Sequence, residues 1–124
     1  GIESTHNLIE EELKVEITTR DVNDVKVVQI EGELDTGSSP EAQKQLDQIR
    51  EEGAKKILLD MTKLDFISSA GLRVLLATAQ ELKQDGGDLR VCSLNESVKE
   101  VFAISGFSTL LMVLDNEAKA LSGF

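Results

Sequence analysis

The sequence predicts an α/β fold with a mixed, mostly parallel β-sheet of four to five strands and helices packed on it. Short apolar or β-branched runs alternate along the chain with stretches whose apolar residues recur at helical spacing. The first two strand-like runs follow one another with only turn residues between them, which predicts an N-terminal hairpin. The later strands are separated by helices, and such βα units place their strands in parallel through right-handed crossovers.

Length and composition indicate one globular domain. The chain has 124 residues, of which 40% are hydrophobic and 29% are charged, and these values are typical of soluble proteins. Residues 1–12 are polar and acidic without clear periodicity. We therefore predict a flexible N-terminal arm followed by a single domain over residues 13–124.

The net charge indicates which kinds of partner to expect, and the cysteine content indicates the cellular compartment. The formal net charge is −10, which repels phosphate backbones and anionic headgroups, so we expect no nucleic acid and no membrane as partner. A basic protein partner is favoured instead. No apolar run approaches the roughly 20 residues that span a bilayer. The one cysteine, Cys92, excludes an intramolecular disulfide, and without a signal peptide this predicts a cytoplasmic location.

Strand assignments rest on alternation and on β-branched content. The predicted strands are Leu13–Thr19, Val25–Glu31, Lys56–Asp60, Leu89–Cys92 and Leu110–Val113. Turn-forming residues separate the first two, and a loop over residues 32–40 follows the second. Residues 61–66 are predicted to be a connection without regular structure.

Helical spacing marks three helices and a terminal turn. They cover residues 40–52, a stretch from about Ser69 to Gln84, a stretch between Asn95 and Ser105, and Asn116–Leu121. Ser39 is the expected cap of the first helix, with Pro40 at its first position, and Gly53 ends it. Asn95 or Ser93 is expected to cap the third helix.

Ser68 and Ser69 lie where the chain leaves a predicted strand and enters a predicted helix. Unpaired N–H groups and the positive end of the helix dipole stabilise an anion there, and a phosphate would accept several of those N–H groups. Gly71 lacks a side chain nearby, which would let another backbone or a phosphate approach. A serine before a helix is also the ordinary N-cap. The residues alone leave both interpretations open.

Four motifs resemble, in order, the signatures of the STAS family. They are Gly32–Asp35 (GELD), the strand Lys56–Asp60 (KILLD), Phe66–Leu72 (FISSAGL) and Ile104–Phe107 (ISGF). The resemblance covers roughly residues 13–115. It implies the STAS fold and, for the type that this chain resembles, a non-enzymatic anti-sigma-factor antagonist that regulates transcription and needs no cofactor.

The resemblance also implies a partner-switching cycle. Such an antagonist binds an anti-sigma factor, typically a GHKL-type serine kinase, and the sigma factor is released. The kinase phosphorylates the antagonist with ATP and so breaks the complex, and a PP2C-type phosphatase restores it. By position, Ser69 matches the phosphorylated serine. Ser68 stands where many members carry an aspartate, and it is the second choice.

The expected partner-binding residues surround this serine. They are Asp35, Ser68, Ser69, Gly71, Leu72 and Arg73. Asp35 matches the family's loop aspartate, and either a polar contact to kinase or serine, or local capping of the loop, would explain it. Arg73 lies near the expected phosphate and would pair with it, or it is simply an exposed arginine. Asp60 would close the same corner or cap its own strand end. A weak homodimer is left open.

Other classes of function fit the residues less well. A serine hydrolase would need a general base for Ser69, but the one histidine, His6, lies in the predicted arm, and Ile67 replaces the first glycine of G-x-S-x-G. One histidine, the distant Cys92 and scattered carboxylates give no metal-ligand spacing, so we expect no metal site. The alternative within the family is a scaffold or accessory subunit of a stress-sensing or transporter complex, without sigma-factor output.

Overall fold

The computed structural model describes residues 15–124, so the predicted N-terminal arm and His6 lie outside the described residues. The strands are β1 (Val15–Val22), β2 (Val25–Leu34), β3 (Lys56–Asp60), β4 (Leu64–Ile67), β5 (Asp88–Cys92) and β6 (Met112–Leu114). The helices are α2 (Ser39–Glu51), α3 (Ser69–Gln84), α4 (Glu96–Ile104), a 3-10 turn η1 (Phe107–Thr109) and α5 (Glu117–Leu121). Within this range, no helix has both the length and the apolar character needed to cross a membrane.

The strands form one mixed sheet in the order β1-β2-β3-β5-β6, and β4 pairs with the far end of β2. β1 and β2 are antiparallel, and every other pairing is parallel. The predicted mixed, mostly parallel α/β fold is therefore confirmed. The described residues contain six strands instead of four to five, because β4 was predicted to be a connection.

The hairpin is tighter than the sequence predicted. β1 continues to Val22, which pairs with Val25, so only Asn23 and Asp24 form the turn. Asn23 has a positive φ of 55°, a conformation that asparagine tolerates better than most residues and that the favoured turns of two-residue hairpins use. At the other end, β2 continues through residues 32–34, which were predicted to be loop.

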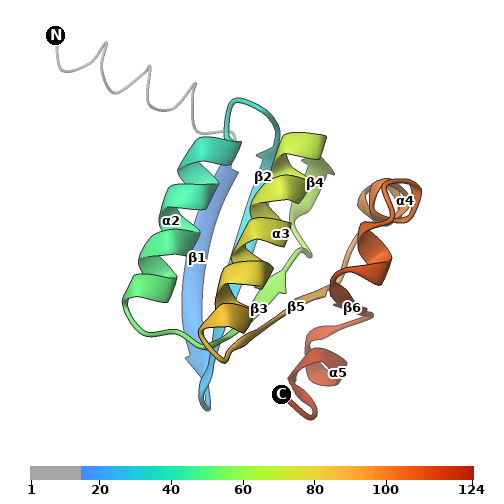
Figure 1. Ribbon diagram of the computed structural model, residues 1–124. Coiled ribbons are helices and arrows are strands. Elements are labelled where there is room, and N and C mark those ends of the chain that lie inside the picture. The colour runs from blue at the N-terminus through green and yellow to red at the C-terminus, as the bar shows by residue number, and fades with distance from the viewer. Residues whose placement is uncertain (1–14) are drawn as a thin grey trace, which may run out of the picture.

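Two layers of side chains cover the sheet. The larger core lies between one face of the sheet and helices α2, α3 and α4, and Figure 1 shows α2 and α3 side by side in front of β1, β2 and β3. The smaller core lies on the opposite face, where Ala120 of α5 packs against Val25, Val27, Leu58 and Cys92. Cys92 is fully buried in this smaller core and is a packing residue.

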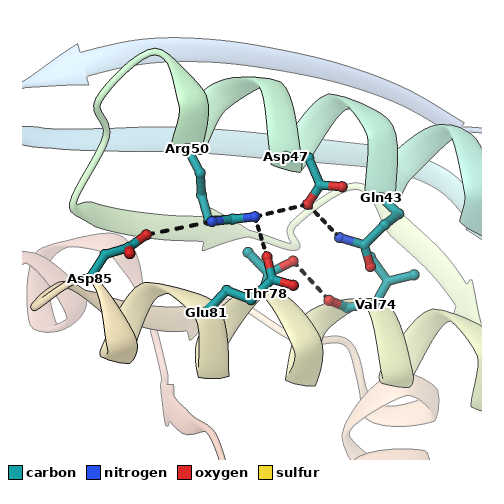
Figure 2. A network of polar contacts seen from close by, with 7 residues as sticks. All are labelled: Gln43, Asp47, Arg50, Val74, Thr78, Glu81 and Asp85. Carbon is teal, nitrogen blue, oxygen red and sulfur yellow. Dashed lines mark hydrogen bonds and ion pairs between the residues drawn. The ribbon is translucent and has the colours of Figure 1, made fainter.

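Arg50 of α2 joins the two helices that cover the larger core. Its guanidinium lies 3.3 Å from Asp47 in its own helix, contacts Glu81 of α3, and lies 3.5 Å from Asp85 at the end of α3. Figure 2 shows these carboxylates converging on Arg50 from both helices. The arginine side chain is only 17% exposed, so these pairs are shielded more than ordinary surface pairs and help to fix α3 beside α2.

Candidate functional site

The candidate site is built by two parallel strands that end together. Leu34 closes β2 and Ile67 closes β4, and the two residues are paired in register. The N–H of Ser68 donates to the carbonyl of Leu34 at 2.9 Å. This pairing brings the loop that begins at Asp35 next to the start of α3, so the GELD and FISSAGL segments meet although they are more than 30 residues apart in the chain.

Asp35 organises the loop between β2 and α2. Its Oδ1 accepts the N–H of Ser38 at 2.9 Å, and its own N–H donates to the Ser38 hydroxyl at 3.0 Å. The Ser39 hydroxyl donates to the Asp35 carbonyl. These bonds give Asp35 the loop-capping role that the sequence allowed, and they hold its half-buried carboxylate at the edge of the site.

The prediction that Ser39 caps α2 is wrong. Ser39 is the first helical residue, and the buried Ser38 occupies the cap position without a side-chain capping bond. The physical reason is that the Asp35 carboxylate already accepts the Ser38 N–H, so the loop closes one residue earlier. Ser38 instead donates its hydroxyl to the Glu33 carbonyl at 2.8 Å.

Ser68 is the N-cap of α3. Its backbone is extended, its hydroxyl oxygen accepts the N–H of Gly71 at 3.2 Å, and the hydroxyl donates to the Leu34 carbonyl at 3.3 Å. Such a cap typically contributes about 1 kcal/mol. Ser68 is half-buried, and its hydroxyl already accepts one hydrogen bond and donates another.

Ser69 differs from Ser68 in both exposure and bonding. It is the first residue of α3 and is exposed, and its hydroxyl makes no hydrogen bond with the residues that the structure describes. The first N–H groups of α3 lie beside it, at the positive end of a helix of 16 residues. An anion at this position would be stabilised by those N–H groups.

Gly71 lets α3 lie directly on the end of β2. A Cβ atom at this position would lie 2.7 Å from the Leu34 carbonyl oxygen, 2.8 Å from Leu34 Cγ and 2.9 Å from Ile67 Cγ1. The sequence left open whether a backbone or a phosphate approaches this glycine. In the structure the backbone of Leu34 occupies that space.

The remaining expected contact residues divide by exposure. Leu72 is 2% exposed and belongs to the core, so it supports the site from beneath and offers no contact area to a partner in this conformation. Arg73 is exposed, one turn after Ser69 on the same helix face. It makes no ion pair within residues 15–124.

Asp60 does not lie at this corner. It ends β3, where it pairs with Gln29, five residues before the end of β2. Its Oδ1 accepts the N–H of Thr62 at 3.0 Å and the Thr62 hydroxyl at 2.5 Å. The strand-end capping interpretation is the one that the structure supports.

Phe66 is an exposed neighbour of the candidate site that the sequence did not single out. It is 46% exposed, immediately before the buried Ile67. Three apolar residues in the four-residue stretch LDFI gave no signal for which one would face outward. No cluster of histidine, cysteine, aspartate and glutamate suited to a metal ion occurs in the part of the chain that the structure describes.

Comparison with known proteins places this geometry in a family. The STAS domain model matches residues 16–120. BtrV of Bordetella bronchiseptica is 32% identical over 110 residues, covering 89% of this chain and 95% of that protein. The anti-sigma F factor antagonist of Paenibacillus polymyxa is 33% identical over 99 residues, covering 79% of this chain and 85% of that protein.

Solved structures agree on the fold. The unphosphorylated form of the anti-sigma factor antagonist SpoIIAA superposes with a TM-score of 0.72 at 23% identity, covering 86% of this chain and 93% of that one. Its phosphorylated form superposes with a TM-score of 0.65 at 22% identity, covering 86% and 96%. The chain is a member of the STAS domain family, and among its homologues are proteins named anti-sigma factor antagonists.

Proposed function

We propose that this protein is a cytoplasmic anti-sigma-factor antagonist that binds an anti-sigma-factor serine kinase and is switched off by phosphorylation at Ser69. The observation that carries the proposal is the contrast between two adjacent serines. Ser69 is exposed with an unused hydroxyl at the start of α3, whereas Ser68 is engaged as the cap. A kinase reaches the first hydroxyl without breaking any contact of the fold.

The site also suits a phosphorylated state. A phosphate on Ser69 would lie at the positive end of α3, where backbone N–H groups can donate hydrogen bonds to its oxygens. Arg73 lies one turn further along the helix, within the i,i+4 spacing that lets charged side chains pair. The phosphoserine would therefore be held on the surface without melting the helix.

Release of the partner would follow from electrostatics. An interface closing over Asp35, Ser69 and Arg73 would have to desolvate about two added negative charges. Leaving such a charge buried and unpaired costs several kcal/mol, and even ~3 kcal/mol weakens binding by more than a hundredfold. A GHKL-type kinase as the partner and a PP2C-type phosphatase as the enzyme that restores binding complete the proposed cycle.

Matched serine variants test this proposal. Purified protein is mixed with each anti-sigma-factor serine kinase of the source organism, and complexes are measured with ADP and then with ATP. We expect wild-type protein to bind with ADP and to dissociate with ATP. Ser69→Ala should stay bound under both conditions, and Ser69→Asp should bind weakly.

Ser68→Ala is the matched control. It should lose about 1 kcal/mol of stability with its cap and still dissociate with ATP. A Ser69→Ala variant that is released by ATP like wild type would overturn Ser69 as the switch. Failure of wild type to bind any such kinase would favour the scaffold or transporter-subunit role.

A further inference from the structure

Phe66 lies uncovered beside the proposed switch serine. It is 46% exposed, whereas Leu64 and Ile67 in the same short strand are buried. Single exposed apolar residues are common on protein surfaces and need no explanation by themselves. The way in which the chain places Phe66 there does require one.

A β-bulge turns Phe66 away from the core. In a regular strand, Phe66 would share the core-facing side with Leu64, because side chains two residues apart lie on one face. Here Leu64 pairs with Gly32 and Phe66 with Glu33, so β4 advances two residues while β2 advances one. Asp65 is the extra residue. The bulge returns Ile67 to the core and leaves Phe66 on the opposite face.

The side chains around Phe66 are acidic. Glu33 is its register partner on β2, and Asp65 is its neighbour in the chain, and both are exposed. Glu31, two residues earlier in β2, is half-buried. Lys63 precedes β4 as a basic residue of this stretch. An aromatic ring therefore stands inside a mostly negative rim.

We propose that Phe66, with Glu33 and Asp65 at its rim, is the anchor of the docking surface for the anti-sigma-factor kinase. The partner would present an apolar pocket bordered by lysine or arginine. This inference rests on the proposed function, from which it takes the partner, and it extends the binding surface from α3 around the end of the sheet. A buried aromatic anchor inside a polar rim is the usual composition of an interface hot spot.

The acidic charge around Phe66 and its closeness in the chain to Ser69 both favour the kinase as the partner that docks here. The negative rim complements a basic border and would speed its encounter, as the chain's net charge of −10 does in general. Phe66 is three residues before Ser69, and both are exposed. A kinase whose active site reaches the Ser69 hydroxyl can therefore contact Phe66 at the same time.

Truncation of the ring tests the anchor. With ADP present, Phe66→Ala should raise the Kd for the serine kinase that binds wild type by about tenfold or more. Ile104→Ala is the matched control, because Ile104 is even more exposed, at 83%, and ends α4; its Kd should stay at the wild-type value. Circular dichroism and the thermal midpoint verify that both variants are folded.

Phosphorylation kinetics separate docking from positioning. A docking contact is equally present before and during phosphoryl transfer, so Phe66→Ala should raise KM for the antagonist and leave kcat unchanged. A loss of kcat with unchanged KM would contradict the docking role, because it would indicate that Phe66 only positions Ser69.

Charge reversal tests the rim. Glu33→Lys should slow association and weaken its dependence on salt, whereas Glu100→Lys on α4, with the same change of net charge, should have a clearly smaller effect. Equal effects of the two substitutions would show that net charge alone attracts the partner, and would contradict the role given to Glu33 at the rim.

The two proposals can be told apart. If wild type binds the kinase and Phe66→Ala binds it equally well, only the inference about Phe66 is overturned. If wild type does not bind, the proposed function is overturned together with it.

Discussion

At the scale of single residues, one absent methyl group decides how closely α3 approaches the sheet. A Cβ on Gly71 would meet the Leu34 carbonyl oxygen at 2.7 Å and side-chain atoms of Leu34 and Ile67 at 2.8 and 2.9 Å. Two of the three obstacles belong to packed side chains and one to the backbone. None of them is the free end of a flexible chain, so the helix itself would have to move.

Gly71→Ala should therefore lower the free energy of unfolding by about 1–3 kcal/mol, the usual cost of overpacking, and urea denaturation measures this change. Gly37→Ala is the matched control in the neighbouring loop, because a Cβ there would have Asp35 Oδ1 at 3.5 Å, an ordinary contact. Equal effects of the two substitutions would show that Gly71 is not needed for the close approach.

Residue identity alone predicted part of the site. The GELD and FISSAGL motifs singled out Asp35, Ser68 and Ser69, which the structure brings to one corner. The resemblance favoured Ser69 over Ser68, but the sequence could not show which of the two is exposed, because their exposure depends on which hydroxyl meets the Leu34 carbonyl from another strand. Nor could it predict that Leu72 is buried, since a leucine in a motif can face either the core or a partner, and the residue type does not show which.

At the scale of elements, Asn95 fastens α4 to β4. Its Oδ1 accepts the N–H of Val98 at 2.8 Å, and its Nδ2 donates to the Leu64 carbonyl at 2.9 Å. The cap was predicted from the sequence, with Ser93 as the alternative, whereas the link to β4 could not be predicted because β4 itself was not expected. One side chain thus joins a helix start to a distant strand.

Asn95→Ala removes both bonds and should cost about 1–2 kcal/mol of stability, measured by thermal or urea unfolding. Asn116→Ala is the control, because Asn116 caps α5 with a single bond to the N–H of Lys119. It should cost less. A larger effect at Asn116 would contradict the assignment of Asn95 as the connection between α4 and β4.

Arg90 holds α5 against the second face of the sheet. Its guanidinium donates to the carbonyls of Ala120, Ser122 and Gly123 at 2.8–3.0 Å, and it lies over the ring of Phe124. These contacts hold α5 and the final residues over Cys92, and burial raises the pKa of that thiol.

Arg90→Ala should expose Cys92. The thiolate is the reactive form, and a raised pKa keeps the buried thiol protonated at pH 8, so Ellman's reagent should react slowly with wild type. The variant should react several-fold faster, because α5 opens more often. Arg73→Ala, a change at an arginine without ion pairs in the described residues, should react at the wild-type rate. Equal rates in all three proteins would contradict the role given to Arg90.

β4 shows why periodicity failed at one element. A strand is recognised in a sequence by alternation, and the bulge at Asp65 breaks that alternation within four residues. β4 is fixed as a strand by its pairing with β2, which the local sequence does not reveal. The β2 extension was missed for a related reason, because Gly32 and Glu33 have low strand preference and are held there by β1 and β4.

At the scale of the whole molecule, the alternation of strands and helices was enough to predict the architecture. The parallel pairings of β2, β3, β5 and β6 follow from right-handed crossovers through the helices between them. The position of α5 could not be predicted, because its five residues carry little periodicity. Its contacts are made by Arg20 of β1, which pairs with Glu117, by Arg90 and by the apolar residues of the back face.

We expect phosphorylation to leave the fold unchanged. A phosphate on the exposed Ser69 adds charge at a helix start that already favours an anion. Hydrogen exchange of the phosphorylated and unphosphorylated protein should therefore differ only around residues 33–40 and 66–76. Changes in β5, β6 or α5 would contradict a purely electrostatic switch and would indicate a conformational one.

Peptide mass spectrometry after incubation with the serine kinases of the source organism and ATP tests most directly whether Ser69 is the phosphorylated switch residue. We expect a single phosphate, on Ser69. A phosphate on Ser68 would keep the switch but contradict the assignment of its residue, because that hydroxyl caps α3 and bonds to Leu34. No phosphate with any of these kinases would contradict the antagonist switch itself.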